Sequence, residues 1–434
     1  MREGNLNRRV RPEAYGLLCF GVMCLGFVFV KIAGFAPGVI APDLIREFGL
    51  DATELGLLGA LYLWGYAAIQ IPTGIMADTL GPRRTAGLFM LVAAAGTLLF
   101  GMAIAYQMSA VGRALMGIGT GILFVSNAKM LAQWFPTNRF ATLQGILLMV
   151  GNFGVLASAA PLAALVEALG WRLSFILLSG LAALVAVLIF VLVRDKPGDV
   201  AGSAVAASAE LDGMDSAPKI ALGDAARLVL LNRNLWLLAV YAFVLYGALM
   251  AIQGLWAVPY LMDVYGLLRQ DASNVITMWP LGTILASPVW GYLSDRVLRT
   301  RKWVVFGGVV SFSLPFVALV LSPAGLPLWS LYGLFFFCGV TNSAVAVSFA
   351  LLNDVIPRQI VGTAVGLYNV WFFVGGAVYQ QAAGAILDRF AVNGHGTVDG
   401  YRAVFLVCLI GAWIGALAIL AARERGTMAA IAVD

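Results

Sequence analysis

Two basic side chains stand inside long apolar stretches of the sequence, where a charge is costly and is usually retained for a function. Lys31 follows Tyr15 by roughly 24 Å of helix at 1.5 Å per residue, deep within the first stretch. Arg113 lies only a turn or two inside a later stretch, so a structural role is as open for it as contact with a solute. Arg113, Thr120 and Asn127 repeat every seven residues, and we expect their shared helix face to border a central cavity.

Carboxylates are missing from the centres of these apolar stretches, so no buried acid is apparent as a carrier of a coupling proton. The acids that come closest all fall at the ends of the stretches: Asp43, Glu167, Asp263, Asp354 and Asp388. In a medium of low dielectric constant, Lys31 without a compensating acid attracts an anion. The pattern therefore favours an anionic solute.

Aromatic and amide side chains accompany the two cations. Tyr246, Gln253 and Tyr260 are spaced by seven residues in one stretch, which predicts a common face. Hydrogen bonding between helices explains such residues as well as a solute path does, and both interpretations stay open. The residues predicted to bind the solute are Lys31, Tyr66, Gln70, Arg113, Thr120, Asn127, Asn152, Tyr246, Gln253, Trp256, Asn342, Tyr368, Asn369 and Trp371.

The elements that carry these residues are membrane-spanning helices. The 434 residues are 61% hydrophobic and 11% charged, whereas a soluble domain has about 25% charged residues. Apolar runs long enough to cross a bilayer follow one another nearly end to end. We expect twelve spans, at 15–41, 54–76, 85–105, 108–132, 141–168, 172–193, 234–262, 273–294, 303–322, 327–353, 361–387 and 402–422.

Basic residues between the spans predict the orientation. If the N-terminus is cytoplasmic, nineteen Lys and Arg residues outside the spans fall on that side and five on the other. Both termini are therefore expected in the cytoplasm. These residues form no basic face interleaved with aromatics, so nucleic acid is not an expected partner.

The chain is predicted to divide into two six-helix halves, 1–194 and 234–434, joined by a flexible cytoplasmic linker over 195–233. The expected fold class is all-α integral membrane, with twelve transmembrane helices in two pseudo-symmetric six-helix bundles. The linker is rich in Gly, Ala, Ser and Asp and lacks hydrophobic periodicity.

An internal repeat indicates the same division. The segment Gly74 to Arg84 recurs as Gly291 to Lys302, and Phe135 to Gly145 recurs as Ile356 to Gly366. The tripeptide GWR at 170–172 returns as GYR at 400–402. Three matches in the same order favour two related halves.

The loop after the second span resembles the signature loop of the major facilitator superfamily. This resemblance implies a conformational latch, in which a carboxylate at one helix end accepts hydrogen bonds from a facing helix and arginines pair across the seam between the halves. The alternative is that these charges only determine topology. The latch residues would be Gly74, Asp78, Gly81, Arg83 and Arg84, with Gly291, Asp295 and Arg296 in the second copy.

Two further segments are similar to that family. Arg113 with Gly117 resembles its RxxxG motif, and WFPTNR after the fourth span is similar to the branches that carry organic acids, sugar phosphates or nitrate. Sugar-phosphate carriers are expected to place a basic residue in both halves. The second half of this chain has none in the middle of a span, which counts against a phosphate.

The sequence thus predicts a secondary permease of a bacterial inner membrane, or of a membrane derived from it, that moves a small anionic solute by alternating access. Its partners would be the solute, the bilayer and, as an open question, a coupling ion. We expect no cofactor, metal site or enzymatic activity. We expect the protein to be a monomer. Two alternatives remain: an iron or metal-chelate permease of a magnetosome-like membrane, and a non-transporting sensor or assembly protein.

Overall fold

The computed structural model describes residues 12–197, 228, 230–356, 361–392 and 396–422, and these ranges contain helices without a strand. The predicted linker lies largely outside them, so its bounds and those of the halves stay a prediction. The first eight helices are α1 (Pro12–Phe35), α2 (Pro37–Phe48), α3 (Ala52–Leu80), α4 (Pro82–Gly101), α5 (Tyr106–Thr120), α6 (Leu123–Trp134), α7 (Thr137–Ala157) and α8 (Ala160–Leu192).

The later helices include two short π-helical turns, η3 and η4. They are α10 (Arg233–Ala251), η3 (Ile252–Trp256), α11 (Ala257–Tyr265), α12 (Arg269–Tyr292), η4 (Leu293–Val297), α13 (Arg301–Leu321), α14 (Leu328–Asn342), α15 (Val345–Val355), α16 (Val361–Val392) and α17 (Thr397–Ala421).

These helices correspond to the twelve expected spans, but several spans are broken. The first is divided into α1 and α2, the fourth into α5 and α6, and the tenth into α14 and α15. Within the described ranges, ten helical stretches are long and apolar enough to cross a membrane. The two remaining spans involve α12, which contains Pro280 and Pro288, and α7, whose apolar part, Thr142–Ala157, is shorter.

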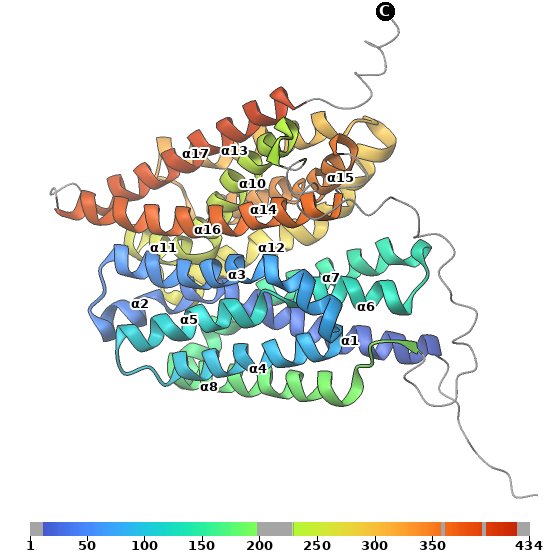
Figure 1. Cartoon of the computed structure of the whole chain (residues 1–434). Helices are drawn as coiled ribbons and strands as arrows, with labels where there is room; N and C mark the ends of the chain where they lie inside the picture. Colours follow the sequence, from blue (N-terminus) through green and yellow to red (C-terminus); the bar gives the residue numbers. More distant parts are fainter. Residues whose placement is uncertain (1–11, 198–227, 229, 357–360, 393–395, 423–434) are drawn as a thin grey trace, which may run out of the picture.

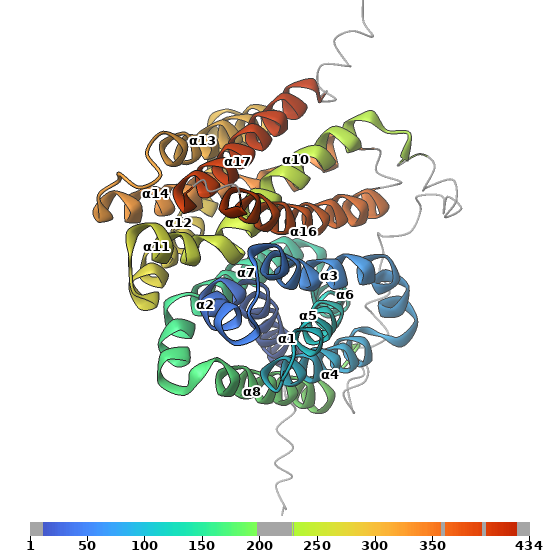
Figure 2. The same ribbon diagram turned by 90° about the vertical axis from the view of Figure 1, so that its left-hand side faces the viewer.

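Two bundles make up the molecule (Figure 1). Helices α1 to α8 pack together in the N-terminal half and α10 to α17 in the C-terminal half, which confirms the predicted fold class. Seen end-on, the bundles meet along α3 and α16, and α12 lies against α7 and α8 (Figure 2). We call the end where α1 begins and α17 ends the termini end, and the opposite one, with the α4–α5 and α16–α17 connections, the distal end.

Close glycine contacts repeat in the two halves. A Cβ atom on Gly117 would overlap the carbonyl oxygen of Tyr62, and one on Gly339 would overlap that of Trp279. The first pair joins α5 to α3 and the second joins α14 to α12. Since small residues let membrane helices approach closely, these glycines determine the packing distance in each half. The repeat seen in the sequence therefore extends to backbone contacts.

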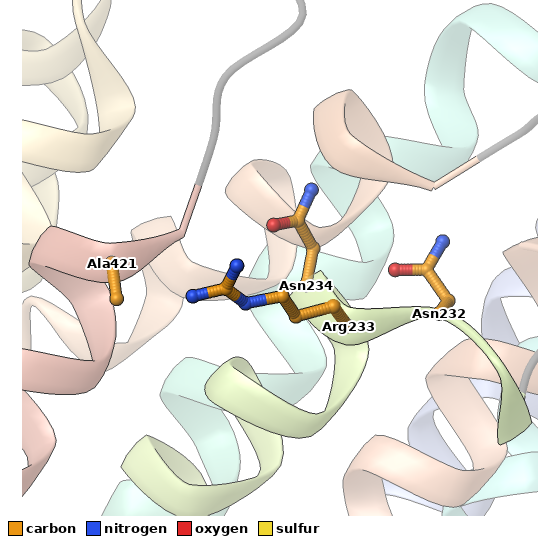
Figure 3. Close-up of a pocket in the computed structure, with 4 residues that line it drawn as sticks. All are labelled: Asn232, Arg233, Asn234 and Ala421. Atoms are coloured by element: carbon orange, nitrogen blue, oxygen red, sulfur yellow. The ribbon is translucent and has the colours of Figure 1, made fainter.

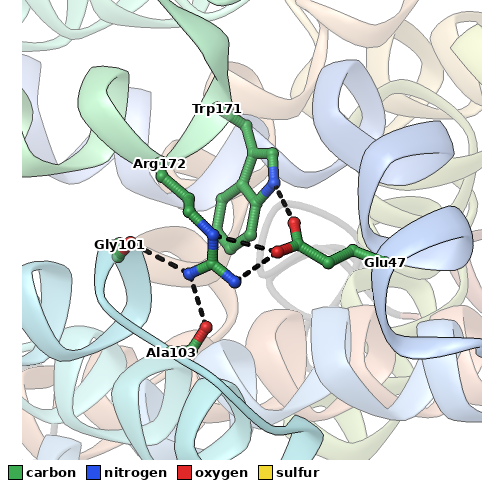
Figure 4. Close-up of polar contacts among 5 residues, drawn as sticks. All are labelled: Glu47, Gly101, Ala103, Trp171 and Arg172. Atoms are coloured by element: carbon green, nitrogen blue, oxygen red, sulfur yellow. Dashed lines mark hydrogen bonds and ion pairs between the residues drawn. The ribbon is translucent and has the colours of Figure 1, made fainter.

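A brace at the distal end joins α2, α8 and the α4–α5 connection in the N-terminal half (Figure 4). Trp171 Nε1 donates a hydrogen bond to Glu47 Oε2 at 2.7 Å, and Arg172 Nε donates to Glu47 Oε1 at 3.0 Å. The Arg172 guanidinium also donates to the carbonyls of Gly101 and Ala103. Gly170, with a φ of 77°, supplies the left-handed turn that aims the next two side chains at α2.

The C-terminal half has a related brace at the matching GYR tripeptide. Tyr401 OH donates to Asp263 Oδ2 at 2.8 Å, as Trp171 does to Glu47. Arg402 Nε donates to the carbonyl of Val320 at 3.2 Å, near the end of α13. The guanidinium pairs with Asp399 of its own helix at 2.8 Å and not with Asp263.

Candidate solute-binding site

Lys31 lies near the middle of the α1–α2 span. Its Nζ is 5.3 Å from the ring centroid of Phe27, a favourable distance for a cation over an aromatic face. The stem runs along α7, where a Cβ on Gly154 would come within 2.9 Å of Lys31 Cβ. We find no hydrogen bond or ion pair between Lys31 and any residue that the structure describes. This ammonium group therefore has an aromatic neighbour and no counterion in the described chain.

Arg113 is enclosed within the N-terminal half, with 1% of its surface exposed. Its Nη1 donates to the carbonyl of Ala33 at 2.8 Å, and Nε and Nη2 point at the carbonyls of Leu58 and Gly59, each at 3.4 Å. The guanidinium lies 4.9 Å from the ring centroid of Tyr62. These contacts join α1, α3 and α5, and they support the structural alternative for Arg113.

The face that Arg113 was expected to share also lies inside this bundle. Thr120 Oγ1 is 3.0 Å from Tyr62 OH, and Asn127 Nδ2 donates to the carbonyl of Leu123 at 3.0 Å. Both side chains are fully buried. In this structure the predicted cavity face is therefore covered by α1 and α3, which the seven-residue spacing alone could not indicate.

Aromatic rings meet where the two halves touch. Tyr66 of α3 stacks on Phe373 of α16, with 3.8 Å between the ring centroids. Tyr246 of α10 packs against Phe373 and Phe372, each at 5.5 Å. Two predicted site residues from different halves are thus brought to one cluster, and the ring between them, Phe373, was not predicted.

Gln253 and Trp256 lie in the π-helical turn η3, at the seam. Gln253 lines a cavity of about 10 Å³, which is room for one water molecule. Trp256 Nε1 donates to the carbonyl of Gln380 at 3.3 Å. The cavity is lined from both halves by Phe35, Gly38, Val39, Val155, Ser158, Ala159, Gln253, Val258 and Ile276.

The turn η3 also corrects the predicted alignment of Tyr246, Gln253 and Tyr260. A π-helical turn contains an extra residue, which rotates everything that follows it. Tyr260 consequently packs inside the C-terminal half, against Tyr401 at 5.2 Å between centroids. Its side chain does not share a face with Gln253.

The other predicted residues are dispersed. Tyr368 donates to Ser348 at 2.8 Å, and Trp371 packs on Trp236 and Phe243 inside the C-terminal half. Asn152 donates to the carbonyl of Leu148 on its own helix. The remaining three keep at least part of their surface inside the protein: Gln70, Asn342 and Asn369.

The signature loop makes its described contacts within one half. Arg83 N donates to Asp195 Oδ1 at 2.7 Å, and Arg83 Nε donates to the carbonyl of Phe190 at 3.1 Å. The expected pairing of this arginine across the seam is absent from these contacts. Gly81 has a φ of 83° between α3 and α4, and Arg84 is exposed. The structure does not describe the surroundings of Gly74 or of the Asp78 side chain.

In the second copy of the loop, Asp295 and Arg296 lie in the π-helical turn η4 and are exposed. Gly291 precedes them near the end of α12, with open space where a Cβ would lie. Neither copy of the loop contributes an identified contact between described residues of the two halves. The described contacts of the two loops therefore form no latch at the termini end.

The distal end is where the halves are joined. Asp388 of α16 caps the start of α3: its Oδ1 accepts from Ala52 N at 2.9 Å and its Oδ2 from Thr53 N at 2.6 Å. Asp43 of α2 pairs with Arg269 of α12 at 2.7 Å. Both acids fall at span ends in the sequence, but their partners lie more than 200 residues away and no sequence pattern connects them.

A second set of distal contacts joins α8 to α12. Gln270 Nε2 donates to the carbonyl of Ala160, and Ala160 N donates to Thr277 Oγ1, each at 3.3 Å. The hydrogen bonds and ion pair that we identify between described residues of the two halves all lie toward this end. The structure is therefore closed at its distal end.

A larger pocket, of about 250 Å³, lies away from the seam (Figure 3). It is formed by the start of α10 and the end of α17, both in the C-terminal half. Its lining consists of Asn232, Arg233, Asn234 and Ala421. Because neither half-to-half surface contributes to it, this pocket is not part of the candidate solute path.

Comparison with known proteins agrees with this architecture. The Major Facilitator Superfamily model matches residues 23–268 and 243–430. The "Probable sulfoacetate transporter SauU" of Cupriavidus necator is 29% identical over 418 residues, covering 93% of each chain. The hexuronate transporter of Bacillus subtilis is 27% identical and covers 85% of this chain and 88% of its own.

Solved structures have the same fold. A bacterial homologue of the human lysosomal transporter Spinster, in an inward-facing and unoccupied conformation, superimposes with a TM-score of 0.76 at 17% identity. The alignment covers 93% of this chain and 97% of that one. The chain belongs to the Major Facilitator Superfamily and is a multi-pass membrane protein that acts as a secondary permease.

Proposed function

We propose that this permease carries a small organic anion across a bacterial inner membrane, with both termini in the cytoplasm. The observation that carries the proposal is Lys31, a cation near the middle of a span. Among the described residues, its one identified neighbour of opposite electrostatic character is the face of Phe27. Membrane-buried charges without a counterion mark substrate paths. A bound carboxylate or sulfonate would supply the missing negative charge.

Names of relatives point to the same class of solute. Sulfoacetate, hexuronate and D-galactonate, which the names of three relatives carry, are small organic anions. A carboxylate or sulfonate suits a single lysine better than a phosphate, for which a base in the middle of each half would be expected. The metal-chelate permease and the non-transporting protein are not favoured by these relatives.

The same proposal gives the conformational cycle. In the structure the distal end is closed by the Asp388 cap and the contacts of α12, so the solute would exchange with the cytoplasm at the termini end. Opening the distal end would require the halves to rock about the aromatic cluster of Tyr66, Tyr246 and Phe373. The signature loops at the termini end would then form the predicted latch.

Uptake measurements test the proposal. Purified protein in proteoliposomes is given labelled sulfoacetate, galacturonate or galactonate, with Lys31→Ala and Lys31→Arg beside the unsubstituted chain. We expect uptake of at least one anion, its loss in Lys31→Ala and partial retention in Lys31→Arg, because arginine keeps the charge. Lys196→Ala, at an exposed lysine beyond α8, is the matched control and should transport normally.

Thermal stabilisation of the detergent-solubilised protein provides an independent readout of binding. Stabilisation confined to neutral or cationic compounds, or full activity of Lys31→Ala, would contradict the anion proposal. Binding of an anion without uptake in any orientation would favour the non-transporting alternative.

A further inference from the structure

The ion pair between Asp43 and Arg269 is buried at the distal seam. Asp43 Oδ2 and Arg269 Nη2 are 2.7 Å apart, and 8% and 15% of the two side chains is exposed. Asp43 comes from α2 and Arg269 from the first turn of α12, so the pair crosses between the halves. Any opening of the distal end must separate these two groups.

Separation leaves the two partners in unequal positions. Asp43 has a second cation, since its Oδ1 accepts a hydrogen bond from Arg46 at 2.9 Å and both residues belong to α2. Arg269 has no such reserve: its Nε is buried and has no hydrogen-bond partner among the described residues. Asp271 is the nearest acid on α12, but two residues place it roughly 200° around the helix, and it is exposed.

Arg269 lies on the distal side of the cavity at the seam and of Lys31. Val39, one turn before Asp43 on α2, and Ile276, two turns after Arg269 on α12, line the small cavity at the seam. Lys31 lies twelve residues before Asp43, which is roughly 18 Å of helix. The order from the distal end inward is therefore the ion pair, the cavity and Lys31.

We propose that Arg269 is the anion-binding residue of the C-terminal half, exposed to the solute only when the distal end is open. This inference rests on the proposed function. Asp43 occupies the guanidinium in the closed state, and a solute carboxylate or sulfonate replaces it in the open one. A guanidinium released from its carboxylate can bind a carboxylate or sulfonate through two parallel charge-assisted hydrogen bonds. The base missing from the middle of the second half is thus supplied at its entrance.

An anion-binding Arg269 can be distinguished from a purely structural gate, because Asp43 and Arg269 then have opposite effects on the binding of an anion. Asp43→Asn removes the competitor and leaves Arg269 charged and free. Arg269→Gln removes the binding group, while Asp43 keeps Arg46. Both changes break the ion pair and should open the distal end equally, yet they should move the KM for an anion in opposite directions.

The experiment uses right-side-out membrane vesicles, in which the distal end faces the medium, with labelled sulfoacetate as the probe. We expect Arg269→Gln to raise KM about tenfold or more, the loss of a charge-assisted bond. Asp43→Asn should lower KM, and Arg269→Lys should raise it less than Arg269→Gln does, because lysine retains the cation but not the two parallel N–H donors. Gel filtration confirms that each variant is folded.

Opening of the distal end is measured separately. Val39→Cys, in a chain whose four native cysteines are replaced by alanine, reports labelling by a membrane-impermeant thiol reagent. Labelling should rise to the same extent in Asp43→Asn and Arg269→Gln. The exchanged variant Asp43→Arg with Arg269→Asp should restore low labelling but not the KM, since its arginine then lies on α2.

Equal shifts of KM in the same direction for Asp43→Asn and Arg269→Gln would overturn the proposal and leave the pair as a gate alone. An exchanged variant that restores KM would overturn it too. If the unsubstituted chain takes up sulfoacetate and Arg269→Gln has a normal KM, this inference fails while the proposed function stands. If the unsubstituted chain takes up no organic anion at all, the proposed function fails and this inference with it.

Discussion

The distal braces of the two halves are built at equivalent sequence positions but differ in charge. In the N-terminal half, Glu47 holds both Trp171 and Arg172, so an ion pair and a hydrogen bond join α2 to α8. In the C-terminal half, Tyr401 is the one identified partner of Asp263 among the described residues, and the neighbouring arginine pairs with Asp399 of its own helix. A repeat can therefore keep the geometry of a contact while changing what stabilises it.

One close contact in the cores of the halves, in contrast, is the same in both. Gly117 against Tyr62 and Gly339 against Trp279 are separated by 222 and 217 residues, and each permits direct contact between a helix and a backbone carbonyl. We infer that the halves share this packing contact and have unequal distal ends. At that end Glu47 of α2 has two identified partners on α8, whereas Asp263 of α11 has one, on α17.

The largest effect should come from the glycines, which test the similarity of the cores. Gly117→Leu and Gly339→Leu each force a side chain into a backbone carbonyl, which must shift a whole helix. We expect both variants to lose most of their folded yield by fluorescence-detected gel filtration. Gly307→Leu, at a position with open space around it, is the matched control. A tolerated change in one half only would show that the cores are not alike.

Next in size are the arginines of the braces. Arg172→Ala removes the pair with Glu47, the carbonyl contacts and the stacking on Trp171, whose ring centroid is 4.6 Å away. We expect a loss of about 2 kcal/mol in the free energy of unfolding, since the group is partly exposed. Arg402→Ala should lose less than half as much. Thermal unfolding in detergent measures both, and equal losses would refute the difference between the braces.

The cap across the seam should have a smaller effect on stability than on conformation. Asp388→Asn removes the charge from the group that accepts from Ala52 N and Thr53 N, at a cost of about 1 kcal/mol. We expect greater thiol labelling of a Val39→Cys reporter, because the distal end opens more often. Asp399→Asn, whose identified partner is Arg402 of the same helix, should leave labelling unchanged. Unaltered labelling in Asp388→Asn would show that the cap does not hold the halves.

The smallest effect should distinguish the aromatic donors. Tyr401→Phe deletes one hydrogen bond and leaves Asp263 without its identified partner, whereas Trp171→Phe leaves Glu47 with Arg172. Each loss should be about 1 kcal/mol or less. Increased hydrogen exchange of α11 in Tyr401→Phe, without a matching change of α2 in Trp171→Phe, would sharpen the comparison. The reverse pattern would contradict it.

The fold could largely be predicted from the sequence because lipid demands long apolar helices, and because the repeat relates the halves. Lys31 could be singled out as well, because a charged residue within an apolar run is apparent from the sequence without knowledge of its contacts. The acids at the seam could be recognised only as residues at span ends. The partner of Asp43 is Arg269 and that of Asp388 is the start of α3, and no periodicity connects residues so far apart.

Arg113 shows the other limit. Its position in an apolar stretch suggested either a ligand for a solute or a structural group, and only the three carbonyls around its guanidinium distinguish these roles. Tyr260 was misaligned for a different reason. Seven-residue spacing assumes an unbroken α-helix, and the π-helical turn cannot be recognised from residue types alone.

The π-helical turn η3 rotates the helix face presented by the seventh span. One inserted residue advances the helix by roughly 100°, so the two ends of a single span present different sides to their surroundings. Before the insertion, Tyr246 turns toward the opposite half; after it, Tyr260 turns inward to its own. One continuous helical span can therefore contribute to the boundary between the halves at one end and pack in the interior of its own half at the other.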